Sequence, residues 1–265
     1  MPDIDNHGNF ETTTLATAAV LIIGDEILSG RTQDINLTTI ARFLVPLGID
    51  LLEARVVPDV ESEIVAAINA LRTRYSYVFT TGGIGPTHDD ITTDAIASAF
   101  GVAVEYDETA MEILAARYKP GEFNEARRRM ARIPRGATLI RNRISAAPGF
   151  QIANVFVMAG VPRIMEAMLE DIRPRLEAGV PVISRSLRTN LPEGRIAAPL
   201  EAVQKAHADL RIGSYPYFAA SSPGGSNGTV LVVRGRNKAD VDRAAEEIIR
   251  LAAELGDAAV PEKSG

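Results

Sequence analysis

Short apolar runs and longer stretches with helical spacing alternate along most of this chain. The first run, Ala18 to Ile23, is entirely apolar, as expected of a strand buried on both faces of a sheet. Further along, Ile64, Val65, Ile68 and Leu71 recur at the spacings that place apolar side chains on one face of a helix. This alternation is typical of β–α–β crossovers and predicts an α/β fold.

The same pattern locates the individual elements. In the first part of the chain, strands are expected at 18–23, 49–57, 75–81, 102–106 and 138–142, with a further pair within 150–160. Helices are expected at 34–47, from 59 or 61 onward, and at 91–100, 111–118, 124–132 and 161–176. The remainder predicts strands at 182–187, 211–218 and 229–235 and helices at 199–207 and 239–255.

Glycine and proline in the segment 177–181 mark a domain boundary. We therefore expect a main domain at 18–178 and a small α+β module at 179–265. The preceding residues 1–17 are acidic and contain no Lys or Arg, which predicts a disordered arm rather than a signal peptide. A cytoplasmic protein is expected.

Composition excludes several kinds of chemistry. The 265 residues carry 28 basic and 34 acidic side chains, and this net charge of −6 gives no overall field to attract nucleic acid or an anionic membrane. The absence of cysteine excludes disulfides, thiolate zinc sites and thiol catalysis, so a metal ion would bind to oxygen or imidazole. The longest apolar run is too short to span a membrane. Neither the P-loop motif nor the dinucleotide-binding glycine motif is present.

A polar loop follows the third expected strand, in the stretch TTGGIGPTHDDITTDA at 80–95. Its glycines let the backbone approach a ligand and turn N–H groups toward an oxyanion, and the next helix adds its positive end. Its carboxylates are suited to a hard divalent cation beside a phosphate. The simpler alternative is a glycine turn with an aspartate capping a helix. The candidate residues are Gly82, Gly83, Gly85, Thr80, Thr81, Thr87, His88, Asp89 and Asp90.

Two more polar loops are expected at the same edge of the sheet. The stretch GDEILSGR at 24–31 supplies carboxylates for a metal ion in Asp25 and Glu26, and candidate ligand contacts in Gly24, Ser29 and Gly30. The segment VVPD places Asp59 nearby. A helix-capping turn explains the first loop equally well. Acidic clusters at the ends of three parallel strands suit metal-assisted attack on a phosphate or phosphoanhydride.

Seven arginines lie close together in the sequence between 127 and 143. Arginine binds phosphate through two parallel hydrogen bonds, so some of them are candidates for neutralising a ligand. A solvated helix face or a subunit interface is the simpler explanation for most. The pattern does not identify which one faces the expected site. They are Arg127, Arg128, Arg129, Arg132, Arg135, Arg141 and Arg143.

Six motifs, read in order, resemble the molybdopterin-binding family with the MoaB/Mog fold. They are GDEILSG, VVPD, TTGGIGPTHDD, IPRGATLIRN, AAPGF and AGVP. The resemblance covers about residues 18–178 and is strongest to the branch of competence/damage-inducible protein A (CinA). The motif GSYP and the terminal module also resemble that branch and the amino-terminal domain of eukaryotic FAD synthases. The resemblance implies a three-layer α/β/α main domain, a KH-like terminal module and a homo-oligomer. The module lacks the GXXG clamp of KH domains, so direct nucleic-acid binding is not expected.

The resemblance also implies roles for individual residues. Asp90 and Asp59 match the acidic residues at the pterin and molybdate site of the family, and Gly82, Gly83 and Gly85 match the glycines that hold a terminal phosphate. One departure is the segment 158–162, Met-Ala-Gly-Val-Pro, which lacks the first proline of the family's pattern because Ala159 stands in its place. The amidohydrolase and adenylyltransferase domains of longer relatives are not found in this sequence, so neither of those activities is expected.

Two functions follow as hypotheses. The first is a pyrophosphatase that depends on a divalent metal ion, Mg²⁺ or Co²⁺, and cleaves a nucleotide pyrophosphate such as ADP-ribose or FAD. Asp90, Asp59 and His88 are its candidate catalytic residues, and its candidate metal ligands are Asp25, Glu26, Asp89 and Asp90. The second is a molybdopterin-binding protein of molybdenum cofactor biosynthesis that does not hydrolyse its ligand. In both cases the ligand carries a nucleotide or pterin phosphate.

Overall fold

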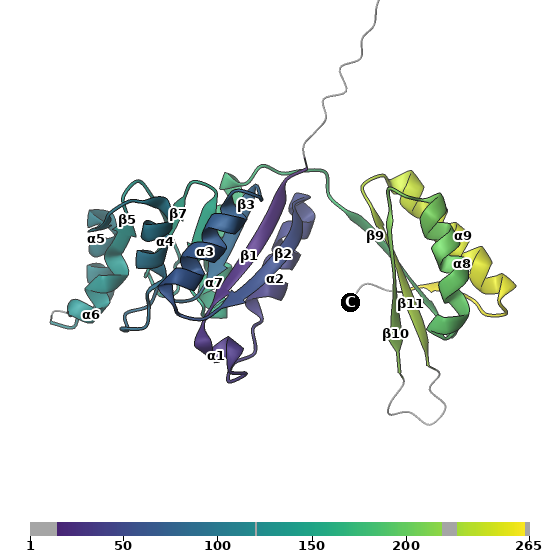
Figure 1. The fold of residues 1–265 in the computed structure, drawn as a ribbon, viewed down its shortest axis with the longest axis horizontal. Helices are drawn as coiled ribbons and strands as arrows, with labels where there is room; N and C mark the ends of the chain where they lie inside the picture. The colour runs from purple at the N-terminus through teal and green to yellow at the C-terminus, as the bar shows by residue number, and fades with distance from the viewer. Residues whose placement is uncertain (1–14, 120, 219–226, 263–265) are drawn as a thin grey trace, which may run out of the picture. The chain divides into compact units, whose positions relative to one another are not determined.

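The computed structural model describes residues 15–119, 121–218 and 227–262. The chain forms two compact units, the first ending at Gly179 and the second beginning at Val180 (Figure 1). The predicted arm at 1–17 lies outside the described residues except for its last three. Each unit is described by itself.

A six-stranded sheet forms the centre of the first unit, in the order β2-β1-β3-β8-β7-β6. Four neighbouring strands are parallel, namely β2 (Asp50–Val57), β1 (Thr17–Ile23), β3 (Tyr77–Thr81) and β8 (Val155–Met158). The strands β7 (Gly149–Ile152) and β6 (Thr138–Ile140) continue the sheet in antiparallel fashion. The carboxyl ends of the four parallel strands therefore meet at one edge, where ligands bind in open α/β sheets.

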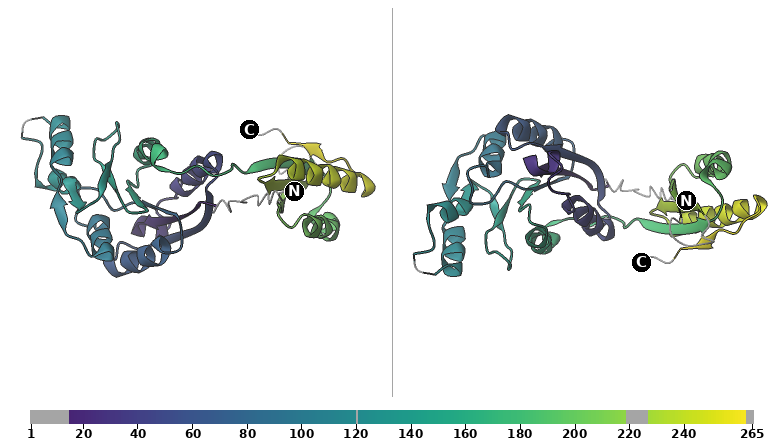
Figure 2. Two further views of the ribbon diagram at one scale, coloured as in Figure 1. Left: turned by 90° about the horizontal axis from the view of Figure 1, so that it is seen from above. Right: turned by 90° about the horizontal axis from the view of Figure 1, so that it is seen from below.

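Helices cover both faces of this sheet (Figure 2). On one face, α2 (Asn36–Leu44) and α7 (Pro162–Ile172) bury their apolar sides against alternate residues of β1, including Val20 and Ile22. On the other face, α3 (Glu61–Arg72) and α4 (Thr92–Phe100) pack against Leu21 and Ile23. Because β1 is buried on both sides, its sequence is apolar throughout. The predicted three-layer α/β/α fold is confirmed.

A side lobe, residues 104–134, lies next to α4. It contains the strand pair β4 (Val104–Tyr106) and β5 (Arg132–Pro134), with α5 (Glu108–Arg117), α6 (Glu125–Arg128) and the 3-10 turn η2 (Arg129–Ala131) between them. Its small core is formed by Ala110, Leu114 and Ala131. The lobe is tied to the main fold by Arg132, which makes two hydrogen bonds to the carboxylate of Asp94 in α4, at 2.6 and 3.0 Å.

The second unit is an antiparallel sheet with two helices. Its strands lie in the order β10-β11-β9-β12. The helices bury their apolar sides against Leu187, Leu231 and Val233 of this sheet. The elements are β9 (Ile183–Thr189), α8 (Glu193–Ala206), β10 (Arg211–Tyr217), β11 (Gly228–Gly235), α9 (Lys238–Glu254) and β12 (Val260–Pro261).

The structure differs from the sequence-based prediction in a few elements. The expected loop at 24–31 contains a one-turn helix, α1 (Asp25–Leu28). Arg132, expected in a helix, begins β5. The helix expected at 199–207 already begins at Glu193, because Ile196, Leu200 and Val203 form one buried stripe that continues through Pro199. Two 3-10 turns, η1 (Val45–Leu47) and η3 (Arg173–Arg175), extend α2 and α7.

Within the described ranges, no helix is long and apolar enough to cross a membrane.

Candidate functional site

The glycine loop, residues 82–91, leaves the end of β3 in a conformation that requires its first two glycines. Gly82 has a φ of +106°, and a Cβ at this position would collide with the carbonyl oxygen of Ile23 at the end of β1. Gly83 has a φ of +65°, and a Cβ there would collide with the hydroxyl of Thr92. That hydroxyl donates a hydrogen bond to the Gly82 carbonyl at 3.0 Å. The loop is therefore packed tightly against β1 and the start of α4.

Asp90 folds back over the glycine loop. Its carboxylate accepts a hydrogen bond from the backbone N–H of Thr87 at 2.8 Å and a second from the Thr87 hydroxyl. A Cβ at Gly85 would lie 2.7 Å from one oxygen of this carboxylate. The side chain thus fixes the turn at 85–90 and also presents negative charge next to the glycine backbone. The Thr87 hydroxyl is also the main cause of a lowered pKa at Asp89.

A hydrogen bond to the carboxylate of Asp59 connects the loops that follow β1 and β2. Asp59 accepts a hydrogen bond from the backbone N–H of Asp25 at 2.9 Å, so it caps the first turn of α1 from a neighbouring loop. Burial raises the pKa of Asp59 above its usual value. The Asp25 N–H opposes this, and the negative charges of Glu26, Asp25 and Asp89 raise the pKa further. Four predicted acidic residues are therefore close enough to interact electrostatically.

This acidic cluster, Asp25, Glu26, Asp59 and Asp89, has the donor chemistry that Mg²⁺ and similar hard cations prefer, because every donor is a carboxylate oxygen. The raised pKa of Asp59 shows that its neighbours repel its charge, and a cation would relieve this repulsion. The side chains do not converge on one point. In the part of the chain that the structure describes, no three His, Asp or Glu side chains are grouped closely enough to hold a metal ion. Glu26 instead lies over Gly24.

The other predicted site residues differ in how far they approach this cluster. Thr81 is buried at the end of β3, directly before the glycine loop. Ser29 and Gly30 are exposed at the end of α1, and Gly30 takes a φ of +71° with open space around it. The His88 side chain is 97% exposed and its nearest charged partner is Asp89, at 3.9 Å. His88 therefore lies on the solvent side of the loop, and its catalytic role stays a prediction.

The loop after β8 completes this edge of the sheet. Gly160 packs against Gly82, since a Cβ on Gly160 would lie 3.3 Å from the Gly82 Cα. The carbonyl of Gly160 accepts a hydrogen bond from the side-chain amide of Asn36 at 2.8 Å. Asn36 begins α2 and is only 4% exposed. The sequence analysis did not select this residue; its only signal is a polar side chain at the start of an amphipathic helix.

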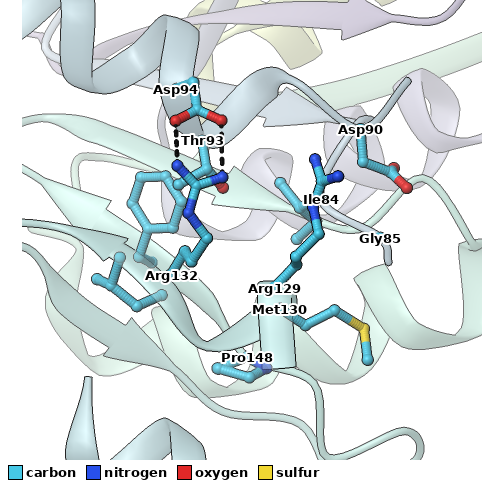
Figure 3. A pocket seen from close by; sticks show the side chains of 11 residues that line it. Ile84, Gly85, Asp90, Thr93, Asp94, Arg129, Met130, Arg132 and Pro148 are labelled. Atoms are coloured by element: carbon cyan, nitrogen blue, oxygen red, sulfur yellow. Dashed lines mark hydrogen bonds and ion pairs between the residues drawn. The ribbon is translucent and has the colours of Figure 1, made fainter. Parts of the chain in front are cut away.

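A cleft opens between the glycine loop and the side lobe (Figure 3). Gly85 and Asp90 line one wall, and Thr93 and Asp94 of α4 lie next to them. The opposite wall comes from the lobe and includes Arg129, Met130 and Arg132. The cleft therefore combines backbone N–H groups, hydroxyls and guanidinium groups, which suit an anionic ligand. Sequence reasoning identified the arginine cluster but not its members at this cleft.

Comparison with known protein families gives two matches. Residues 19–178 match the family described as probable molybdopterin binding domain. Residues 181–258 match the middle domain of FAD synthase. The two matches correspond to the two resemblances predicted from the motifs.

Individual relatives agree with these matches. A protein of Archaeoglobus fulgidus is 32% identical over 233 residues, covering 88% of this chain and 96% of that protein. A CinA-like protein of Citrifermentans bemidjiense is 39% identical over 194 residues, covering 69% of this chain and 47% of that protein. The crystal structure of the protein CinA with unknown function from Thermoplasma acidophilum is similar with a TM-score of 0.58 and 32% identity, covering 61% of this chain and 99% of that one. The predicted resemblance to CinA is confirmed.

The close contact between Gly82 and Ile23 leads us to expect a loss of folding stability when a side chain is added at Gly82. Gly82→Ala should lower the free energy of unfolding by about 3 kcal/mol, because it adds both backbone strain and a steric clash. Gly101→Ala is the control, since Gly101 also has a positive φ but has open space around it, and should cost about 1 kcal/mol. Chemical denaturation of both variants measures the difference. Equal losses would contradict the tight packing described here.

The raised pKa of Asp59 leads to a second prediction, which concerns the dependence of folding stability on pH. Its pKa is raised in the folded protein, so its contribution to stability is complete at low pH and is lost as the pH rises through the folded-state pKa. Asp59→Asn keeps an oxygen that can accept the Asp25 N–H bond but removes the charge. The variant should melt at a higher temperature than the natural protein at pH 7, measured with chelator present. The gain should shrink toward zero as the pH falls to about 4. A variant less stable at pH 7 would show that the carboxylate charge is stabilising.

Proposed function

The chain belongs to the family of probable molybdopterin binding domains, and on this basis we propose that it hydrolyses a nucleotide pyrophosphate, such as ADP-ribose or FAD, with a divalent metal ion. The observation that carries the proposal is the position of the acidic cluster beside the glycine loop. Asp59 interacts electrostatically with Asp25, Glu26 and Asp89, and these residues come from three loops at one edge of the parallel sheet.

The glycine loop has the features of a phosphate-binding backbone. Gly82 and Gly83 both have positive φ values, and the loop leads into the N-terminus of α4. Backbone N–H groups and a helix N-terminus both favour an anion. In the proposed reaction they bind one phosphate of the substrate and stabilise the charge that develops on its oxygens.

The acidic cluster provides the complementary part of the site. Asp25 and Asp89 would hold the divalent ion once their side chains turned toward one point, and the ion would polarise the pyrophosphate and lower the pKa of a bound water molecule. Asp90 orders the glycine loop through its two hydrogen bonds from Thr87. Water adds to one phosphorus, the bridging P–O bond breaks, and two phosphate monoesters leave. ADP-ribose would give AMP and ribose 5-phosphate, and FAD would give AMP and FMN.

Asp59 is the group best placed to receive the proton of the attacking water. It is half-buried, and the Asp25 N–H fixes its orientation by a hydrogen bond to one carboxylate oxygen.

A second candidate function is supported by the family match. A probable molybdopterin binding domain that lacks hydrolytic activity would present a pterin phosphate on the same glycine loop and take part in molybdenum cofactor assembly. Fold alone does not separate the two functions. They differ in metal dependence, because a binder retains its ligand without a metal ion whereas the proposed hydrolase needs one.

The test is nucleotide-release analysis on the purified full chain. ADP-ribose, FAD and NAD are incubated in turn with magnesium, with cobalt and with chelator. We expect AMP only with metal. Asp59→Asn should lower kcat by about 100-fold or more, the scale of a lost acid–base group, and Asp90→Ala, which removes the acceptor of both Thr87 hydrogen bonds, should lower it as well. Asp209→Asn, an exposed change in the second unit, should leave the rate unaltered.

Absence of AMP under every metal would overturn the pyrophosphatase proposal. Stoichiometric retention of a pterin phosphate in the presence of chelator would then support the binding function. Full activity in Asp59→Asn would instead exclude the carboxylate from the reaction.

A further inference from the structure

The arginine cluster separates into groups once the partners of each side chain are known. Arg127 and Arg128 lie over the rings of Tyr118 and Phe123 within the side lobe. Arg132 is paired with Asp94, and Arg135 with Glu105. These four side chains hold the lobe together and attach it to the main fold.

Three arginines of the cluster make no hydrogen bond or ion pair within 4 Å to any residue of the described ranges, namely Arg129, Arg141 and Arg143. Arg141 and Arg143 are exposed and lie in a separate hollow beside Glu170 and Asp171 of α7. Arg129 is half-buried and lines the cleft together with Gly85 and Asp90. Arg129 is therefore the member of the cluster that combines available donors with a position at the candidate site.

The backbone of Arg129 is held in place from both sides. It begins the turn η2, whose last residue, Ala131, is fully buried in the lobe core. The next residue, Arg132, is fixed by its two hydrogen bonds to Asp94. In Figure 3 the Arg129 side chain extends from η2 across the cleft toward the glycine loop, beside Ile84. A guanidinium group in this position carries donors that need an acceptor, and burying part of it without one is unfavourable.

We propose that Arg129 binds the second phosphate of a ligand whose first phosphate lies on the glycine loop. The inference rests on the proposed function and adds to it the residue that recognises the second of the two adjacent phosphates. The planar guanidinium group can donate two parallel hydrogen bonds to the oxygens of the second phosphate. The amides of the glycine loop bind the first phosphate alone, so a monophosphate already satisfies them. The cleft thereby distinguishes a nucleoside diphosphate from a nucleoside monophosphate.

The experiment measures equilibrium binding, not turnover. Isothermal titration in the presence of chelator compares AMP with ADP in which a methylene group replaces the bridging oxygen, so that the probe is not hydrolysed. The natural protein should bind the diphosphate probe more tightly than AMP. Arg129→Ala should weaken binding of the probe by about 10- to 100-fold, the scale of a lost charge-assisted hydrogen bond, and change AMP binding by less than about 3-fold.

Two further variants make the result specific. Arg143→Ala removes the same charge from the separate hollow beside α7 and should leave both affinities unchanged. Arg129→Lys keeps the charge but loses the planar pair of donors, so it should restore only part of the affinity for the probe. Melting temperatures close to that of the natural protein are expected for all three variants.

The outcomes separate this inference from the proposed function. Selective loss of probe binding in Arg129→Ala, together with no AMP release under any metal, would support the diphosphate site and overturn the hydrolase. Metal-dependent hydrolysis with unchanged probe binding in Arg129→Ala would overturn the role of Arg129 alone. Equal affinity of the natural protein for AMP and the probe, or equal weakening of both ligands in the variant, would also overturn it.

Discussion

The close approach of Gly82 to the carbonyl of Ile23 determines how the loops at the edge of the sheet are arranged. No side chain fits between the ends of β1 and β3 at this point. The N–H of Gly82 donates to the carbonyl of Met158 at the end of β8, and Gly160 packs against its Cα. One residue without a Cβ thus contacts the ends of three parallel strands, and the polar loops that follow them are held together as a result.

The electrostatics of this edge oppose folding. Carboxylates gather around Asp59, whose partial burial already disfavours its charged form. Elsewhere in the molecule, Glu53 accepts hydrogen bonds from Tyr75 and Arg55 and Glu105 is paired with Arg135, so the pKa values of both carboxyl groups are lowered. Asp59 is therefore an exception to the way this protein usually places negative charge, whereas the pKa of its neighbour Asp89 is lowered. Uncompensated charge of this kind is found most often where a ligand supplies the compensation.

Much of the fold could be predicted because the hydrophobic pattern within an element shows which of its faces are buried. The continuous apolar run of β1 and the one-sided pattern of α3 are local signals, and both were interpreted correctly. The one-turn helix α1 has no such signal, because its cap is Asp59 on another loop. For the same reason the choice of Arg129 among seven arginines lay beyond the sequence. It depends on the partners that the fold brings to four of the others and on the separate position of Arg141 and Arg143, and both arise only in three dimensions.

The side lobe has a small core of its own and also contributes Ile133 to the core on the face of the sheet covered by α3 and α4. It meets the cleft through η2 and the start of β5, and it is anchored to α4 by the pair of Arg132 and Asp94. Substitutions around Ala110 and Leu114 can therefore accumulate with little effect on the packing of the sheet, whereas a change at Ile133 would disturb it. In evolutionary terms, the part of the lobe away from the cleft is free to diverge, while the wall that carries Arg129 and Arg132 and the glycine loop opposite it stay constrained.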